Sequence, residues 1–155
     1  MGGTQAARDA EKPPPEGGFS RWRWWKRWFG RRSERAAARH LRRLRFRLIA
    51  FNVSDAAGEL DILAIDGQTL VVVEVRSTSS ARPDAINETA ASVDARKQKK
   101  ITDATARFLA RRGLLGKIAV RYDVLVIAWP DHVREPAVHH IRHAFESVGR
   151  FQFFT

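Results

Sequence analysis

The sequence predicts an α/β fold in which helices flank one mixed β-sheet. The chain has 155 residues, a length that fits one domain with a short appendage. Hydrophobic residues make up 44% of the chain, which is enough for a packed core and excludes a wholly disordered protein. Helix-like and strand-like segments follow in the order α-β-β-β-α-β, which is typical of a mixed sheet with helices against it.

The chain begins with a predicted disordered, basic extension. Residues 1–18 are rich in proline, glycine, alanine and charge, and cannot bury enough apolar surface to become ordered. Residues 19–32 interleave tryptophan and phenylalanine with arginine and lysine. This pattern suits base stacking on single strands, the surface of an anionic membrane, or packing on the chain's own domain. We therefore divide the chain into an extension, residues 1–32, and an α/β domain, residues 33–155.

The domain is expected to start with a helix at residues 33–44. Ser33 can cap this helix, and its apolar residues recur at the spacing of one buried stripe. Four strands are predicted, at residues 46–53, 59–65, 70–76 and 118–128.

The connections complete this prediction. Residues 77–90 are expected to form a polar loop, and residues 93–112 a helix that Gly113 ends. Residues 137–147 are expected to begin extended and then turn helical.

Composition excludes several classes of protein. The chain has no cysteine, which excludes a disulfide scaffold, a thiolate zinc site and a cysteine nucleophile. No apolar run reaches the roughly 18–20 residues that span a bilayer, and the N-terminus lacks the order of a secretory signal. We therefore expect a cytoplasmic protein.

The positive charge is concentrated in one stretch. The net formal charge is +11, and the residues from Arg21 to Arg47 account for all of it, with Glu34 as their only acidic residue. This concentration indicates a polyanionic partner, either nucleic acid or an anionic membrane surface. A solvated helix face is the alternative.

The predicted hairpin places acidic side chains on one face. Because side chains alternate along a strand, Glu59 and Asp61 share a face with Glu74 and Arg76. A four-residue turn at 66–69 puts Asp61 directly opposite Glu74, and a shorter turn is the alternative. The other face is apolar and consists of Leu60, Ile62, Ala64, Val71, Val73 and Val75.

Two carboxylates in this position require a positive partner. Opposed side chains lie about 4.5–5.5 Å apart, and like charges at that distance destabilise a sheet. Hard oxygen ligands at this spacing suit Mg²⁺ or Mn²⁺, although a solvated face paired with Arg76 and lysines is the alternative. Helical periodicity places Lys97 and Lys100 on the face toward the sheet, where their ammonium groups would meet the carboxylates, bind a phosphate or extend to water.

Six short motifs between residues 33 and 145 stand in a characteristic order. They are Glu34 with Ala37-Ala38 and His40-Leu41, Asn52, GELDILA at 58–64 with VVVEVRS at 71–77, Val93 with Lys97 and Lys100-Ile101, Arg121-Tyr122-Asp123-Val124, and His140-Ile141 with Ala144-Phe145. The set resembles the YraN-like family of predicted endonucleases, part of the PD-(D/E)XK nuclease superfamily that includes Holliday-junction resolvases. This resemblance implies a restriction-endonuclease-like mixed β-sheet flanked by helices.

The resemblance also implies roles for single residues. Asp61 and Glu74 would hold Mg²⁺ or Mn²⁺ together with the backbone carbonyl of Val75, Glu34 would contribute from the first helix, and Glu59 would support the site. The metal would activate water and stabilise charge on phosphate oxygens during phosphodiester hydrolysis. Nucleic acid, DNA ahead of RNA, would be bound by basic side chains, for which we select Lys97, Lys100, Arg39, Arg42 and Arg43.

Two positions depart from the family pattern. Arg76 stands where the superfamily has lysine, and arginine keeps its proton, so it can bind phosphate but cannot act as a general base. Arg45 stands where the family tends to have glycine, and a left-handed helix cap there would be strained by a side chain.

Two functions therefore remain open. One is a metal-dependent endonuclease that acts on DNA, including branched DNA, with Arg76 as a catalytic-site residue. The other is a non-catalytic nucleic-acid-binding module of the same fold. A homodimer is a further candidate assembly. For His139, His140 and His143 we favour a structural role over a metal site, because no carboxylates accompany them in sequence.

Overall fold

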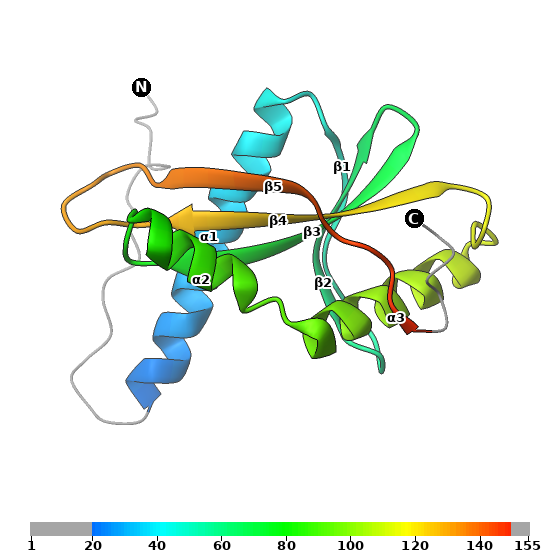
Figure 1. Ribbon diagram of the computed structural model, residues 1–155, viewed down its shortest axis with the longest axis horizontal. Coiled ribbons are helices and arrows are strands. Elements are labelled where there is room, and N and C mark those ends of the chain that lie inside the picture. Colours follow the sequence, from blue (N-terminus) through cyan, green and yellow to red (C-terminus); the bar gives the residue numbers. More distant parts are fainter. Residues whose placement is uncertain (1–19, 150–155) are drawn as a thin grey trace, which may run out of the picture.

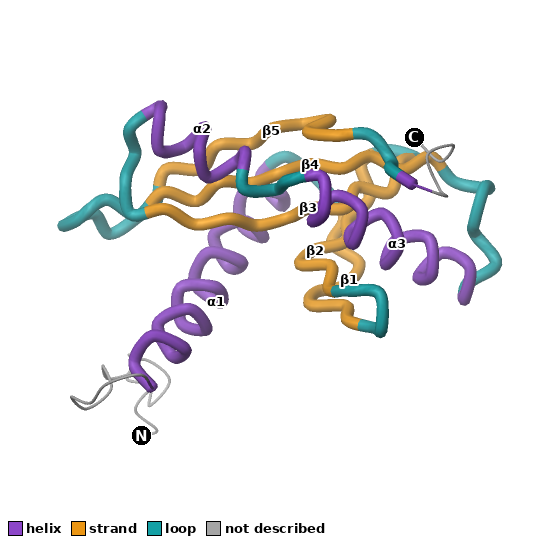
Figure 2. The backbone as a smooth tube through the Cα atoms, turned by 60° about the horizontal axis from the view of Figure 1, so that its bottom comes forward, coloured by secondary structure: helices purple, strands orange, loops and turns teal. Residues whose placement is uncertain are grey.

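The computed structural model describes residues 20–149, with side chains from Arg31 onward. The predicted disorder of residues 1–18, and the partners predicted for the aromatic side chains of residues 19–32, therefore lie outside the described part. A mixed five-stranded sheet forms the centre, with α1 on one face and α2 and α3 on the other (Figures 1 and 2). The predicted α/β class is confirmed.

The described chain contains helices and strands in a simple order. They are α1 (Ser20–Arg43), β1 (Arg47–Ser54), β2 (Glu59–Asp66), β3 (Thr69–Thr78), α2 (Pro83–Ala91), α3 (Ala95–Arg111), β4 (Ala119–Ala128) and β5 (Ala137–Phe145).

The sheet has the strand order β1-β2-β3-β4-β5, so β1 and β5 form its edges. Neighbouring strands are antiparallel except β3 and β4, which are parallel. A parallel pair needs a crossover connection, and α2 and α3 provide it.

Two apolar clusters hold the helices against the sheet. On the α2 and α3 face, Leu63 and Val72 pack with Ile86, Ile101 and Phe108. The cluster on the α1 face contains Ile62, Val73, Ala37, Leu41 and Trp129. Burial on both faces explains why β3 contains the apolar run LVVV at 70–73 and β4 the run VLVIA at 124–128.

The hairpin has one of the two predicted registers. Ile62 pairs with Val73, and the ladder continues to Asp66 and Thr69 around a two-residue tip. This is the register of the predicted four-residue turn, although the turn itself is shorter. The prediction that Leu60 shares a face with Ile62 is wrong, because Leu60 packs in the cluster of Leu63. β2 leaves β3 beyond Ile62, so strict alternation is not imposed there.

Three predictions about single elements are wrong. α1 begins at Ser20, so Ser33 is no cap but a buried residue whose Oγ accepts a hydrogen bond of 2.9 Å from Trp129 Nε1. Part of the loop predicted at 77–90 is α2, where Pro83 stands at the first turn, a position that suits proline. The helical end predicted for 137–147 is strand, because β5 pairs with β4 as far as Phe145, and tertiary pairing outweighs local propensity.

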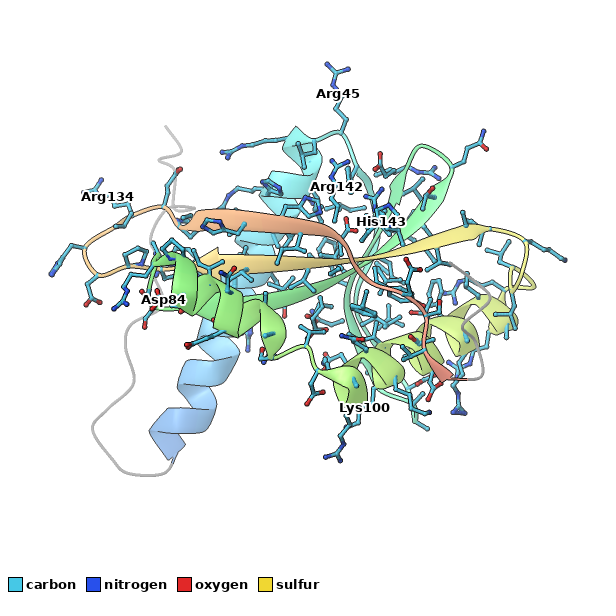
Figure 3. All side chains as sticks on the ribbon, in the orientation of Figure 1. Arg45, Asp84, Lys100, Arg134, Arg142 and His143 are labelled. Carbon is cyan, nitrogen blue, oxygen red and sulfur yellow. The ribbon has the colours of Figure 1, made fainter. Side chains whose placement is uncertain are left out.

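The chain turns into β1 through a strained residue. Arg45 has a φ of 64°, in the left-handed region, and Phe46 N–H donates 3.0 Å to the carbonyl of Leu41. The left-handed conformation expected at this position is therefore present, and the Arg45 side chain projects into solvent (Figure 3).

None of the described helices is long and apolar enough to cross a membrane. The cytoplasmic location, the membrane contact and the homodimer stay predictions.

Candidate active site

Two carboxyl groups meet where β2 separates from β3. The Asp61 carboxylate accepts a 2.7 Å hydrogen bond from the backbone N–H of Val75. Glu74 is only 4% exposed and lies on the sheet face that α3 covers. The Asp61 side chain favours the charged form of Glu74 and thereby lowers its pKa, so the two carboxyl groups are close neighbours. The predicted pairing of these carboxylates is present.

The electrostatics of the pair favour a bound proton. Burial and the neighbouring Glu74 carboxylate raise the pKa of Asp61 to about 7, against the lowering effect of the Val75 N–H and of Lys97. Burial also raises the pKa of Glu74, although Lys97 opposes this shift. At both carboxyls the effect of burial therefore outweighs the opposing effect of the nearby positive charge.

Two cations reach Glu74 from different elements. Lys97 of α3 places its Nζ 3.1 Å from Oε1 of Glu74, as its predicted position toward the sheet requires. Arg76 of β3 is farther away, at 3.8 Å from the same oxygen, and its Nε donates 3.0 Å to Ser92 Oγ. Lys97 is thus the closer positive partner of the pair.

A third carboxylate approaches from α1. Glu34 adds to the raised pKa of Asp61, and its Oε2 accepts a 3.1 Å hydrogen bond from Nδ2 of Asn52. Asn52 has a φ of 48°, a left-handed conformation that asparagine tolerates better than most residues. The distorted end of β1 therefore holds Glu34 beside the site.

Not every predicted residue joins the pair. Glu59 is exposed at the start of β2, opposite Ser54, and no hydrogen bond or ion pair within the described chain joins it to another carboxylate. Lys100 of α3 is exposed (Figure 3), which agrees with the predicted alternative in which its ammonium group extends to water. The stem of Lys100 lies beside Gly58. A Cβ added to Gly58 would lie 3.6 Å from Lys100 Cβ.

A basic groove adjoins the pair on the α1 side. It has a volume of about 340 Å³, and Glu34 and Asn52 belong to its wall. The rest of the lining is Arg31, Arg35, Ala38, Arg39, Arg42 and Phe51. Two of the predicted nucleic-acid-binding residues, Arg39 and Arg42, thus line one groove, whereas Arg43 is exposed outside it.

The histidines have a different position. His140 Nε2 lies 2.8 Å from the buried carboxylate of Asp123, and its Nδ1 lies 3.3 Å from Nε2 of His40. His139 and His143 are exposed. These contacts agree with a structural role for His140.

The same site can be compared with known proteins. The model of the uncharacterised protein family UPF0102 matches residues 33–127. The chain belongs to this family. The match contains five of the six motifs, and the YraN-like resemblance is confirmed at the level of the family.

Relatives in the UPF0102 family span most of the domain. A UPF0102 protein of Rhodopirellula baltica is 43% identical over 128 residues, which cover 81% of this chain and 74% of the relative. UPF0102 proteins of Stutzerimonas stutzeri and Geobacter sulfurreducens are each 40% identical and cover 76% of this chain, with 94% and 88% of their own lengths matched.

The donors of this UPF0102 site fit a hard divalent cation. Among the described residues, no three histidine, aspartate or glutamate side chains gather closely enough to hold a metal by themselves. Mg²⁺ is commonly held by one or two carboxylates and keeps waters or phosphate oxygens as its other ligands. The carboxyls of Glu74, which is buried, and Asp61, which is partly buried, match this requirement.

Sequence reasoning missed three contributors to the site. The link from Asn52 to Glu34 depends on a distortion of β1 that no local pattern indicates. Ser92 reaches Arg76 only because α2 exists. The strand pattern alone does not show that Phe51 lines a groove. The spacing of the arginines on one helix face does predict a basic groove wall, which consists of Arg31, Arg35, Arg39 and Arg42.

Proposed function

We propose that this UPF0102 chain is a metal-dependent endonuclease that hydrolyses phosphodiester bonds in DNA. The observation that carries the proposal is the proximity of the partly buried Asp61 to the buried Glu74, which raises the pKa of Asp61 to about 7 together with burial. Pairs of strongly perturbed carboxyls are characteristic of functional sites, because burying them without a ligand lowers stability.

Three oxygen donors would hold the metal. These are the carboxylates of Asp61 and Glu74 and the carbonyl of Val75, with Mg²⁺ or Mn²⁺ as the cation. When bound, the ion would lower the pKa of a water ligand and stabilise the charge that develops on phosphate oxygens.

The chain's own residues would position the reacting groups. The Val75 N–H fixes the orientation of the Asp61 carboxylate, and Asn52 fixes that of Glu34. Lys97 places an ammonium beside Glu74, where it can contact a phosphate oxygen or a water molecule. Arg76 retains its charge and can bind phosphate through two nitrogens. Lys97 would then supply the lysine that the superfamily has at the position of Arg76.

A cleavage assay tests this proposal. Labelled duplex, flapped and four-way-junction DNA would be incubated with Mg²⁺ or Mn²⁺ and with wild type, Asp61→Asn or Glu74→Gln. We expect each substitution to lower the cleavage rate at least about 100-fold, because both remove charge from the metal site. Glu88→Gln, which changes an exposed carboxylate on α2, is the matched control and should cleave like wild type.

Equal rates in wild type, Asp61→Asn and Glu74→Gln would contradict the proposal. Arg76→Lys adds a further arm, and a faster rate in this variant would show that Arg76 limits the chemistry. Binding without cleavage would instead favour the non-catalytic module. The observation that supports this module is the charged Arg76 side chain beside Glu74. If that module neutralises about six phosphates, the logarithm of its binding constant should fall with the logarithm of the salt concentration with a slope of about −5.

A further inference from the structure

The groove between α1 and β1 combines charge with an exposed aromatic ring. Four arginines line it along one side of α1, and Phe51 of β1 lies among them. Phe51 is 43% exposed, although phenylalanine is usually buried. An aromatic ring surrounded by guanidinium groups is a surface that needs a partner with both phosphate and flat apolar parts.

The arginines of the groove are available for such a partner. None of Arg31, Arg35 and Arg39 forms an ion pair with an acidic side chain in the described part of the chain, and the same holds for Arg42. Glu34 is the only acidic residue in the groove lining, and its Oε2 accepts a hydrogen bond from Asn52. The excess of positive charge therefore favours a polyanion.

The ring favours bases that are not paired. In a duplex the base faces are stacked on one another, so none is open to Phe51. In a single strand, successive bases can stack on aromatic side chains while arginines track the backbone. Base stacking of this kind contributes about 1–3 kcal/mol per base.

Glu34 connects the groove with the candidate site. Phe51 precedes Asn52, and Asn52 Nδ2 donates a hydrogen bond to Glu34, the acidic residue of the groove lining that the proposed function places beside Asp61 and Glu74. We infer that this groove binds a single-stranded segment of nucleic acid, with one base stacked on Phe51, next to the phosphate that the site would attack. The inference rests on the proposed function for the position of the reacting phosphate, and it narrows the substrate to DNA with an unpaired strand.

A second copy of the chain is the main competing occupant, because β1 is an edge strand and Ile49 is exposed beside Phe51. Charge opposes this alternative. The chain carries a net charge of +11, and a copy docked on this groove would bring like charge against its four arginines.

Fluorescence anisotropy of full-length protein tests the inference. The probes are a labelled 12-nucleotide thymidine oligonucleotide and the same phosphodiester chain without bases, both measured in EDTA. Wild type should bind the thymidine strand about tenfold more tightly, which corresponds to one stacked base. Phe51→Ala should lose this preference and leave the affinity for the abasic chain unchanged.

Ile49→Ala is the matched control, because Ile49 lies on the same strand, is 46% exposed and does not line the groove. It should retain the preference. Arg35→Gln should weaken both probes equally, as a phosphate contact does. The inference is overturned if Phe51→Ala keeps the preference or if Ile49→Ala loses it equally. It is also overturned if Phe51→Ala changes sedimentation from dimer to monomer without changing either affinity.

This binding experiment is independent of cleavage, because EDTA removes divalent cations. Loss of stacking in Phe51→Ala together with no cleavage by wild type would support the groove and contradict the nuclease. Cleavage that depends on Asp61 but not on Phe51, with no base preference in binding, would support the nuclease and contradict the groove.

Discussion

Two regions of the molecule bury carboxylates, and they treat the charge in opposite ways. Asp123 lies on β4, which packs against α1 and β5, and Asp61 with Glu74 lies on β2 and β3 beside α3. Asp123 is fully buried, and Glu74 is nearly so. The comparison therefore separates the effect of burial from the effect of the partners.

Asp123 has a partner for each of its oxygens. Arg121 donates to both oxygens, at 2.9 and 3.1 Å, and His140 Nε2 lies 2.8 Å from Oδ2. The backbone N–H of His143 donates 3.1 Å to Oδ1. Burial acts to raise the pKa of Asp123, but hydrogen bonds from His140 and Arg121 outweigh it and hold the pKa below its ordinary value.

Asp61 lacks this compensation. Its hydrogen bond comes from one backbone N–H, and the lowering effect of Lys97 on its pKa is opposed by the carboxylates of Glu74 and Glu34. Charge is therefore stabilised at the fully buried Asp123 by its donors and disfavoured at the partly buried Asp61, which lacks them. Asp123 is thus a fully hydrogen-bonded carboxylate, whereas the pair of Asp61 and Glu74 is the place at which we propose that a cation binds.

The largest effect is expected at Asp123. Asp123→Asn removes the charge that Arg121 and His140 contact, and leaves a buried cation without its main partner. We expect the free energy of unfolding to fall by about 3–5 kcal/mol in urea titrations. Asp84→Asn, which breaks an exposed pair with Arg82, should change it by less than about 0.5 kcal/mol. Equal stability of the two variants would contradict the role given to Asp123.

A smaller effect of opposite sign is expected at the pair. The folded protein holds a proton on Asp61 up to about pH 7, whereas the unfolded chain releases it near its ordinary pKa of 3.8. The contribution of Asp61 to stability therefore falls as the pH rises through this window. Asp61→Asn should remove that fall and stabilise the metal-free protein by roughly 1–2 kcal/mol at pH 8.

Urea titrations in EDTA at pH 5 and pH 8 measure this difference. Glu59→Gln removes an exposed carboxylate from the same strand and should leave the pH dependence as it is in wild type. The comparison fails if Asp61→Asn is less stable than wild type at pH 8. The contribution of Asp123 has the opposite dependence, because its lowered pKa adds stability that is lost only as the pH falls through the folded value.

The sequence was sufficient for the features that depend on local pattern. Alternation along β2 and β3 predicted that Asp61 lies near Glu74, although the ladder itself ends at Ile62 and Val73. Helical periodicity placed Lys97 toward Glu74, because this rule follows from backbone geometry. The family pattern placed the left-handed conformation at Arg45.

Features that depend on distant contacts could not be predicted in this way. Lys100 has the helical spacing of Lys97, but it lies beside Gly58 of the β1–β2 turn and its side chain is exposed. β5 is a strand because β4 pairs with it. The hydrogen bond from Asn52 of β1 to Glu34 of α1 likewise joins two separate elements. Each of these depends on how separate elements pack, which no single segment encodes.

Binding of Mn²⁺ followed by electron paramagnetic resonance tests the central claim most directly. Wild type should bind one ion, and more tightly as the pH rises from 6 to 8, because Asp61 must release its proton first. Asp61→Asn and Glu74→Gln should each weaken binding at least about tenfold, because each removes a carboxylate ligand, while Glu59→Gln binds like wild type. Unchanged Mn²⁺ affinity in both Asp61→Asn and Glu74→Gln would contradict the account.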